Sequence, residues 1–93
     1  MIVELSAEAE ADIKEIYEFI GLDSTTFATI VTDELLSACE RIGQFPYSGI
    51  KSPNQDNPNV REAYYRQYRI AYLIRDNSMF VLAIEHTARD RDN

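Results

Sequence analysis

Apolar residues in the first half of the chain recur at helical spacing. A first stripe steps by i, i+3, i+4 and i+7 through Ile13, Ile16, Tyr17 and Ile20. A second stripe steps by four, four, three and four, and Ile30 and Leu36 widen it; its members are Phe27, Val31, Leu35, Ala38 and Ile42. Two amphipathic helices joined by so short a linker are expected to form an antiparallel hairpin.

The ends of both helices have recognisable signals. Ser6 is the expected N-cap of the first helix, with acidic residues in its first turn and Gly21 as its stop. Asp23 or Ser24 caps the second helix, which Gly43 and Phe45-Pro46 are predicted to end.

The remaining apolar segments follow strand patterns. Ile2–Leu5 is short and rich in β-branched residues, 60–66 is an uneven strand, and Tyr68–Arg75 alternates between two faces. Met79–His86 is apolar on both faces until Glu85, which is typical of a central strand. Asp76-Asn77-Ser78 is the expected hairpin turn, and strands so close in sequence pair antiparallel. The order β-α-α-β-β-β predicts an α+β fold: one domain over residues 1–93, with the helical hairpin on one face of a small antiparallel sheet.

The segment 46–59, PYSGIKSPNQDNPN, interrupts these patterns with three prolines and three asparagines. A structureless loop of this length is uncommon in a compact domain and is often functional. The alternative interpretation is a tolerated surface excursion.

Composition narrows the functional classes. A hydrophobic content of 45% and a charged content of 27% are ordinary for a globular protein. No apolar run approaches the roughly 20 residues of a membrane span, and the acidic N-terminal stretch does not resemble a signal peptide, so we expect a cytoplasmic protein. Cys39 is interpreted as a small buried residue of the second helix. No Cys or His cluster has metal-ligand spacing, and we expect neither metal nor cofactor.

Charge is distributed unevenly along the chain. The net charge is −7; residues 1–40 hold ten acids against Lys14 (−9), and residues 41–93 hold eight bases against six acids (+2). This balance argues against direct, sequence-specific DNA binding by the chain. The arginines of the second half either form a cationic surface or simply neutralise the acidic helices.

Two kinds of chemistry remain open at the last strands. His86 is a candidate base, and Arg61, Arg69 and Arg89 are candidate phosphate ligands, which a ribonuclease would need at one end of the sheet. Against a phosphate site, acidic residues lie at the same end of the predicted sheet. The favoured interpretation of His86 is a strand-end residue that caps a backbone carbonyl or packs on Tyr68.

Protein binding requires less of the sequence. Tyrosines concentrate on two predicted strands, at Tyr64, Tyr65, Tyr68 and Tyr72. Tyrosine suits an interface because one end of its ring stays in water. Half of these rings are also expected to form the core under the helices.

In order and spacing, these segments resemble the RelE/ParE superfamily of bacterial type II toxins over essentially the whole chain. The matching motifs are AxxDIxEIYxFI from Ala9 to Ile20, IGQFPYSG, VRE at Val60–Glu62, YRIAYLI at Tyr68–Ile74, VLAIEH at Val81–His86, and Arg89. The resemblance implies a toxin that a cognate antitoxin neutralises by direct binding. It also implies an antitoxin segment that folds on binding and brings acidic side chains to the arginines.

The superfamily divides into ribosome-dependent mRNA endonucleases (RelE-like) and non-enzymatic inhibitors of DNA gyrase (ParE-like). Arg69 and Arg89 match arginines of the nucleases and Arg61 matches a lysine, but Ala63 stands near the place of a second lysine and the tail tyrosine has no counterpart. His86-x-x-Arg89 resembles the ParE ending. The resemblance therefore implies a gyrase inhibitor with Arg61, Tyr68, Arg69, His86 and Arg89 as target- or partner-binding residues. The alternatives are a nuclease acting on the ribosome and mRNA, and a non-toxic binding module of the same fold, which the acidic charge favours.

Overall fold

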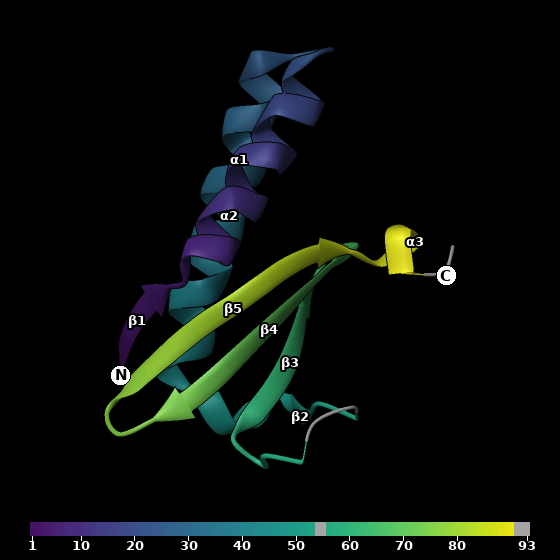
Figure 1. Ribbon diagram of the computed structural model, residues 1–93. Coiled ribbons are helices and arrows are strands. Elements are labelled where there is room, and N and C mark those ends of the chain that lie inside the picture. Colours follow the sequence, from purple (N-terminus) through teal and green to yellow (C-terminus); the bar gives the residue numbers. More distant parts are fainter. Residues whose placement is uncertain (54–55, 91–93) are drawn as a thin grey trace.

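The computed structural model describes residues 1–53 and 56–90, apart from the side chains of Arg89 and Asp90. Its elements in chain order are β1 (Ile2–Leu5), α1 (Ala7–Gly21), α2 (Thr25–Gln44), the 3-10 turn η1 (Pro46–Ser48), β2 (Ile50–Lys51), β3 (Val60–Tyr65), β4 (Tyr68–Arg75), β5 (Ser78–His86) and α3 (Thr87–Asp90) (Figure 1). The predicted α+β order is confirmed, with η1, β2 and α3 as short additions.

Side-chain caps begin both long helices. Ser6 Oγ accepts a hydrogen bond from the backbone N–H of Ala9 at 3.0 Å, and Ser24 Oγ accepts one from Phe27 N–H at 3.0 Å. α2 ends at Gln44 with Phe45 as its C-cap, as predicted from Phe45-Pro46, and it continues through Gly43 rather than ending there. Gly43 is instead a contact residue: a Cβ there would lie 2.4 Å from Cγ2 of Val3 on β1.

The five strands form one sheet in the order β1-β5-β4-β3-β2. The three long C-terminal strands pair antiparallel as predicted, and Asp76, with φ of 57°, lies in the turn between β4 and β5. The sheet as a whole is mixed, because β1 pairs parallel to β5. A parallel pair needs a long crossover, and the helical hairpin and the meander together supply it. Part of the expected loop 46–59 also belongs to the sheet, since β2 pairs with β3.

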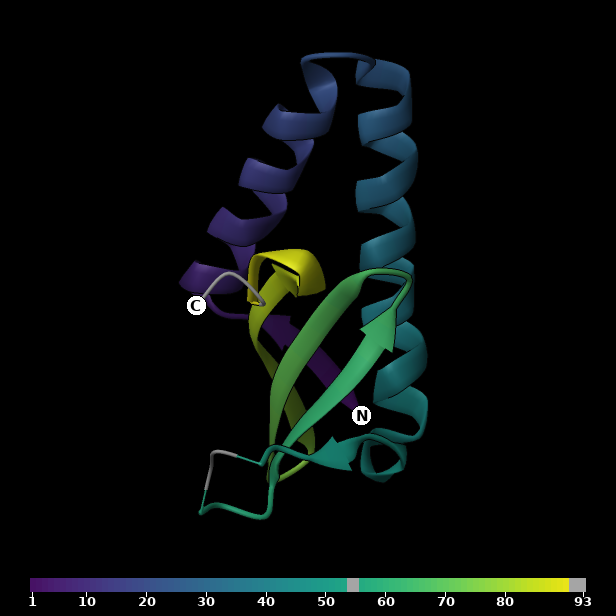
Figure 2. The same cartoon turned by 90° about the vertical axis from the view of Figure 1, so that its right-hand side faces the viewer.

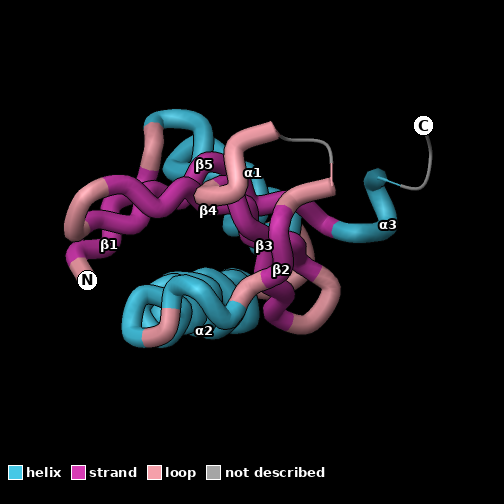
Figure 3. Tube along the Cα trace, turned by 90° about the horizontal axis from the view of Figure 1, so that it is seen from below, coloured by secondary structure: helices cyan, strands magenta, loops and turns pink. Residues whose placement is uncertain are grey.

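The core lies between the helical hairpin and the sheet. Its fully buried side chains are Leu35 and Cys39 of α2, Ile70 and Tyr72 of β4, and Met79 and Val81 of β5. Figure 3 shows α2 along one side of the strands. The far half of the hairpin projects beyond the sheet (Figures 1 and 2). Tyr17 and Phe27, which belong to the two apolar stripes, are 38% and 51% exposed.

Candidate functional site

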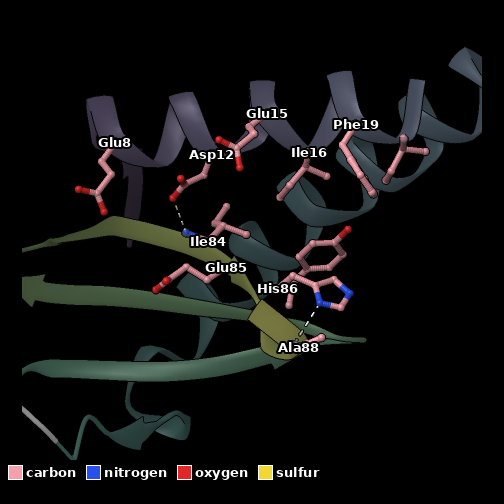
Figure 4. A pocket seen from close by; sticks show the side chains of 11 residues that line it. Glu8, Asp12, Glu15, Ile16, Phe19, Ile84, Glu85, His86 and Ala88 are labelled. Carbon is pink, nitrogen blue, oxygen red and sulfur yellow. Dashed lines mark hydrogen bonds between the residues drawn. The ribbon is translucent and has the colours of Figure 1, made fainter. Parts of the chain in front are cut away.

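A groove of about 500 Å³ opens between α1 and the C-terminal end of β5 (Figure 4). Side chains from α1, from the ends of β4 and β5 and from α3 surround it: Glu8, Asp12, Glu15, Ile16, Phe19, Ile20, Tyr68, Ile84, Glu85, His86 and Ala88. We call it the α1–β5 groove.

The groove forms where β5 extends beyond the end of its neighbour β1. Pairing with β1 ends at Val81, and among the described strands none covers that edge of β5 beyond it. The side chain of Asp12 takes the place of a strand partner, because its Oδ2 accepts a hydrogen bond from Ile84 N–H at 2.9 Å (Figure 4). Ser6 Oγ donates to the carbonyl of Leu82 at 3.0 Å. α1 is thus held beside an exposed strand edge.

The groove combines an apolar floor with an acidic rim. Ile16 and Ile20 of α1 and Ile84 of β5 supply aliphatic surface, and Phe19, which is 70% exposed, stands at one end. Glu8, Asp12, Glu15 and Glu85 supply four carboxyl groups, and the described lining residues include no lysine or arginine. Such a surface suits a ligand with apolar and cationic groups.

His86 is fixed at the mouth of the groove. Its Nδ1 accepts a hydrogen bond from Ala88 N–H at 3.1 Å, and its Nε2 lies 3.1 Å from Oε1 of Gln67. An acceptor role for Nδ1 and the carbonyl partner of Nε2 assign the proton to Nε2. The ring also meets the Tyr68 ring edge to face at 5.2 Å. His86 therefore packs on Tyr68, as one interpretation predicted, but it caps a backbone amide of α3 rather than a carbonyl.

A smaller hollow lies on the other side of this aromatic pair. Phe27 of α2 lines it together with Arg66 and Gln67 of the β3–β4 turn, and Tyr68 and His86 border both hollows. The Tyr68–His86 pair consequently forms a ridge below the projecting half of the helical hairpin.

The structure separates the candidate phosphate ligands. Arg61 pairs with Tyr72 in the β3–β4 ladder, and its Nη1 donates to the carbonyls of Gly49 at 2.9 Å and Tyr47 at 3.2 Å. Arg69 pairs with Glu85 in the β4–β5 ladder, one position from the Tyr68–His86 pair. Because successive side chains of a strand point to opposite faces, the Arg69 side chain lies on one face of the sheet and His86 on the other.

Arg69 is joined to an acid rather than exposed for phosphate. Its Nη2 lies 2.8 Å from Oε1 of Glu85. Arg89 belongs to α3, but its side chain lies outside the described part of the structure. Among the described side chains, the expected meeting of arginines and histidine at one end of the sheet is absent.

The tyrosines divide between core and surface, as both interpretations expected. Tyr72 is fully buried, and its hydroxyl donates to the carbonyl of Pro46 at 2.6 Å. Burial raises the pKa of this phenol above its ordinary value. Tyr64 is exposed on β3.

The acidic side of the groove was missed by reasoning from the sequence. Glu8, Asp12 and Glu15 recur at i, i+4 and i+7, a helical spacing that marks one face of α1. In the sequence alone, that face of α1 has the pattern of an ordinary solvated surface, and only the position of β5 beside it makes it one side of a groove. Within the described residues there is no group of three or more His, Cys, Asp or Glu side chains that could hold a metal ion. None of the described helices is long and apolar enough to cross a membrane.

Two comparisons with known proteins found a similarity, one to a family model and one to a solved structure. The model of the ParE toxin of the type II toxin–antitoxin system parDE matches residues 3–91. A solved structure described as the chromosomal ParDE TA system from P. aeruginosa has the same fold, with a TM-score of 0.77 and 18% identity over 92% of this chain and 95% of that one. A search of curated proteins gave no match.

Proposed function

The chain belongs to the ParE toxin family of type II toxin–antitoxin systems, and on that basis we propose that it is a cytoplasmic toxin that inhibits DNA gyrase without acting as an enzyme. The match to the family over residues 3–91 carries this proposal. A cognate antitoxin would neutralise the toxin by direct binding.

The placement of the candidate catalytic groups supports inhibition over RNA cleavage. A general base needs a free lone pair within reach of its substrate, and both ring nitrogens of His86 are engaged within the chain. Arg69 and Arg61 lie on opposite faces of the sheet, so they cannot grip one phosphate together. Arg61 is better explained as a support for the turn Pro46–Gly49, whose carbonyls it contacts.

Exposed apolar surface supports the proposal of an antitoxin partner. Large apolar side chains stay exposed on the halves of both helices that adjoin the linker between them: Tyr17, Phe19, Leu22, Phe27 and Ile30. Large exposed apolar side chains that gather on one part of a protein often mark sites of protein interaction. An antitoxin segment in the α1–β5 groove would cover part of it and would touch Tyr68 and His86. Arg69, on the other side of the sheet, stays a candidate contact for the toxin's target.

Pulse-labelling of DNA and protein synthesis, within minutes of inducing this chain alone in bacteria, tests the proposal. We expect DNA synthesis to fall first, because a gyrase inhibitor blocks replication. An earlier fall in protein synthesis would point to a ribosome-dependent nuclease and would refute the proposal. Unchanged synthesis of both, with folded protein present, would indicate a non-toxic binding module, which the net charge of −7 favours.

A further inference from the structure

Large apolar side chains are exposed where α2 ends and the edge strand β2 begins. Phe45 is 70% exposed, Tyr47 60% and Ile50 58%. Together with Lys51 they form what we call the β2-edge surface. β2 lies at the opposite edge of the sheet from β1, and this surface and the linker between α1 and α2 lie at opposite ends of the molecule (Figures 1 and 2). The β2-edge surface is therefore separate from the α1–β5 groove.

Hydrogen bonds from the sheet hold the backbone under this surface. The Tyr72 hydroxyl donates to the carbonyl of Pro46 at 2.6 Å, and Nη1 of Arg61 donates to the carbonyls of Tyr47 and Gly49. The guanidinium of Arg61 also lies over the Tyr47 ring, 5.1 Å from its centroid. Exposed apolar side chains on a backbone already fixed in one conformation lose little conformational entropy when a partner covers them.

The charge around the β2-edge surface differs from that of the helices. Residues 41–53 contain no acid, and their two cations, Arg41 in the last turn of α2 and Lys51 on β2, are exposed. Lys51 pairs with Arg61 in the β2–β3 ladder, so the buried Glu62 next to Arg61 lies on the other face of the sheet. Among the described residues, no acid forms an ion pair with Arg41 or Lys51.

We propose that the β2-edge surface is the part of the chain that contacts its target, and that it binds a protein segment with apolar side chains next to carboxylates. This inference rests on the proposed function, in which the target is DNA gyrase. Residues 1–40 carry a charge of −9, so an acidic partner is repelled from most of the helical hairpin and directed toward the end without acids. Tyr47 supplies the kind of aromatic anchor on which protein interfaces depend.

The same charges argue against a nucleic acid on this surface. Binding to DNA or RNA depends on cations that neutralise several phosphates. The chain has a net charge of −7, and the segment offers only Arg41 and Lys51 as exposed cations. Apolar contacts with a protein require fewer charges, so a protein segment is the favoured partner.

Lysine footprinting of the unmodified chain tests the inference. Lys14 on α1 and Lys51 on β2 are the two lysines of the chain, and both are exposed. Each is acetylated with an N-hydroxysuccinimide ester, with and without saturating gyrase and plasmid DNA, and the rates are read by mass spectrometry. We expect gyrase to slow acetylation of Lys51 at least about threefold and to leave Lys14 unchanged, because an interface excludes water and reagent.

Two matched double variants test the same surface through binding and inhibition. Ile50→Ser with Lys51→Glu removes an apolar side chain and reverses a charge on β2. Ile2→Ser with Lys14→Glu makes the same chemical changes elsewhere, since β1 is the other edge strand and Ile2 is 64% exposed. We expect the first variant to bind gyrase and inhibit supercoiling about tenfold more weakly than the wild type, and the control about twofold or less. Circular dichroism checks that both are folded.

The outcomes separate this inference from the proposed function. Inhibition by the wild type with equal effects of the two double variants, or with equal protection of the two lysines, would overturn the inference and leave gyrase as the target. Failure of the folded wild type to bind or inhibit gyrase would overturn the proposed target and this inference with it. Binding to a short DNA duplex without gyrase, lost only in the Ile50→Ser with Lys51→Glu variant, would make the surface a nucleic-acid site and would also overturn the inference.

Discussion

Gly49 of the IGQFPYSG motif contacts the buried Tyr72, and we predict that any larger residue at position 49 lowers the stability of the fold. A Cβ at position 49 would lie 2.1 Å from Oη and 3.0 Å from Cζ of Tyr72, and 2.8 Å from the carbonyl oxygen of Glu62. Tyr72 is fully buried and its hydroxyl is bound to Pro46, so the ring cannot withdraw without losing that hydrogen bond. Gly49→Ala is therefore expected to destabilise the fold.

The magnitude follows from three opposing effects. Overpacking costs about 1–3 kcal/mol, and the loss of the Tyr72–Pro46 hydrogen bond adds about 1 kcal/mol. Gly49 has φ of −70° and ψ of 160°, which alanine adopts without strain, so reduced freedom of the unfolded chain returns about 0.4–1 kcal/mol. We expect a net loss of about 2–3 kcal/mol in the free energy of unfolding.

Urea denaturation of a double-mutant cycle measures this coupling. Tyr72→Phe alone should cost about 1 kcal/mol, since it removes the hydroxyl and keeps the ring. In that background Gly49→Ala should cost clearly less than in the wild type, because the closest clash is gone. Gly21→Ala is the matched control: its Cβ would meet nothing nearer than 4.0 Å, and better helix propensity should leave the protein as stable or up to about 1 kcal/mol more stable. A cost for Gly49→Ala that is negligible, or equal in both backgrounds, would refute this explanation.

Further predictions concern α1, the buried thiol and the arginines. Asp12→Ala should lower the free energy of unfolding by about 1–2 kcal/mol in urea denaturation, because Ile84 N–H loses its charged acceptor. Asp33→Ala, at an exposed position, is the control and should change that free energy by about 0.5 kcal/mol or less. Equal effects of the two substitutions would contradict the role of Asp12 as a partner of the strand edge. Burial raises the pKa of Cys39 from 9.0 to about 11, so the folded state keeps this proton longer than the unfolded state; stability should be unaffected below pH 9 and fall by up to about 2 kcal/mol as the pH rises to 11. Cys39→Ala should flatten that part of the stability–pH curve, and an unchanged slope would contradict the assignment to this thiol. Arg61→Ala should lower the thermal midpoint by several degrees, because the carbonyls of Tyr47 and Gly49 lose their donor, and Lys51→Ala on the adjoining strand should not; equal midpoints would count against a structural role for Arg61. Neither the wild type nor Arg69→Ala should cleave mRNA in the presence of ribosomes, and both should be folded. If the wild type cleaves mRNA and Arg69→Ala abolishes that cleavage, the nuclease hypothesis is restored.

Local signals in the sequence were sufficient for most of the fold. Ser6 and Ser24 cap the helices because their hydroxyls reach the backbone N–H three residues ahead, and such signals depend only on neighbouring residues. The alternation from Tyr68 to Arg75 likewise indicated which side chains of β4 face the helices, and Ile70, Tyr72 and Ile74 are buried there. The resemblance to the superfamily is confirmed by the match of the ParE toxin family model over residues 3–91.

Long-range geometry accounts for what the sequence did not predict. The parallel pairing of β1 with β5 joins the two ends of the chain, and no local pattern specifies it. The α1–β5 groove depends on Asp12 and Ile84, which are 72 positions apart in sequence. Phe27 shares a stripe with buried residues, but it is 51% exposed and lines a hollow with Tyr68 and His86 at the end of the sheet; periodicity alone does not show where a sheet ends. The separation of Arg61 from Arg69 follows from strand register, which places them on opposite faces.

Plasmid supercoiling by purified DNA gyrase, in the presence of excess folded chain, tests the central claim most directly. The proposal predicts that supercoiled product fails to accumulate. Normal supercoiling by gyrase at every concentration of folded chain would contradict the assignment of gyrase as the target.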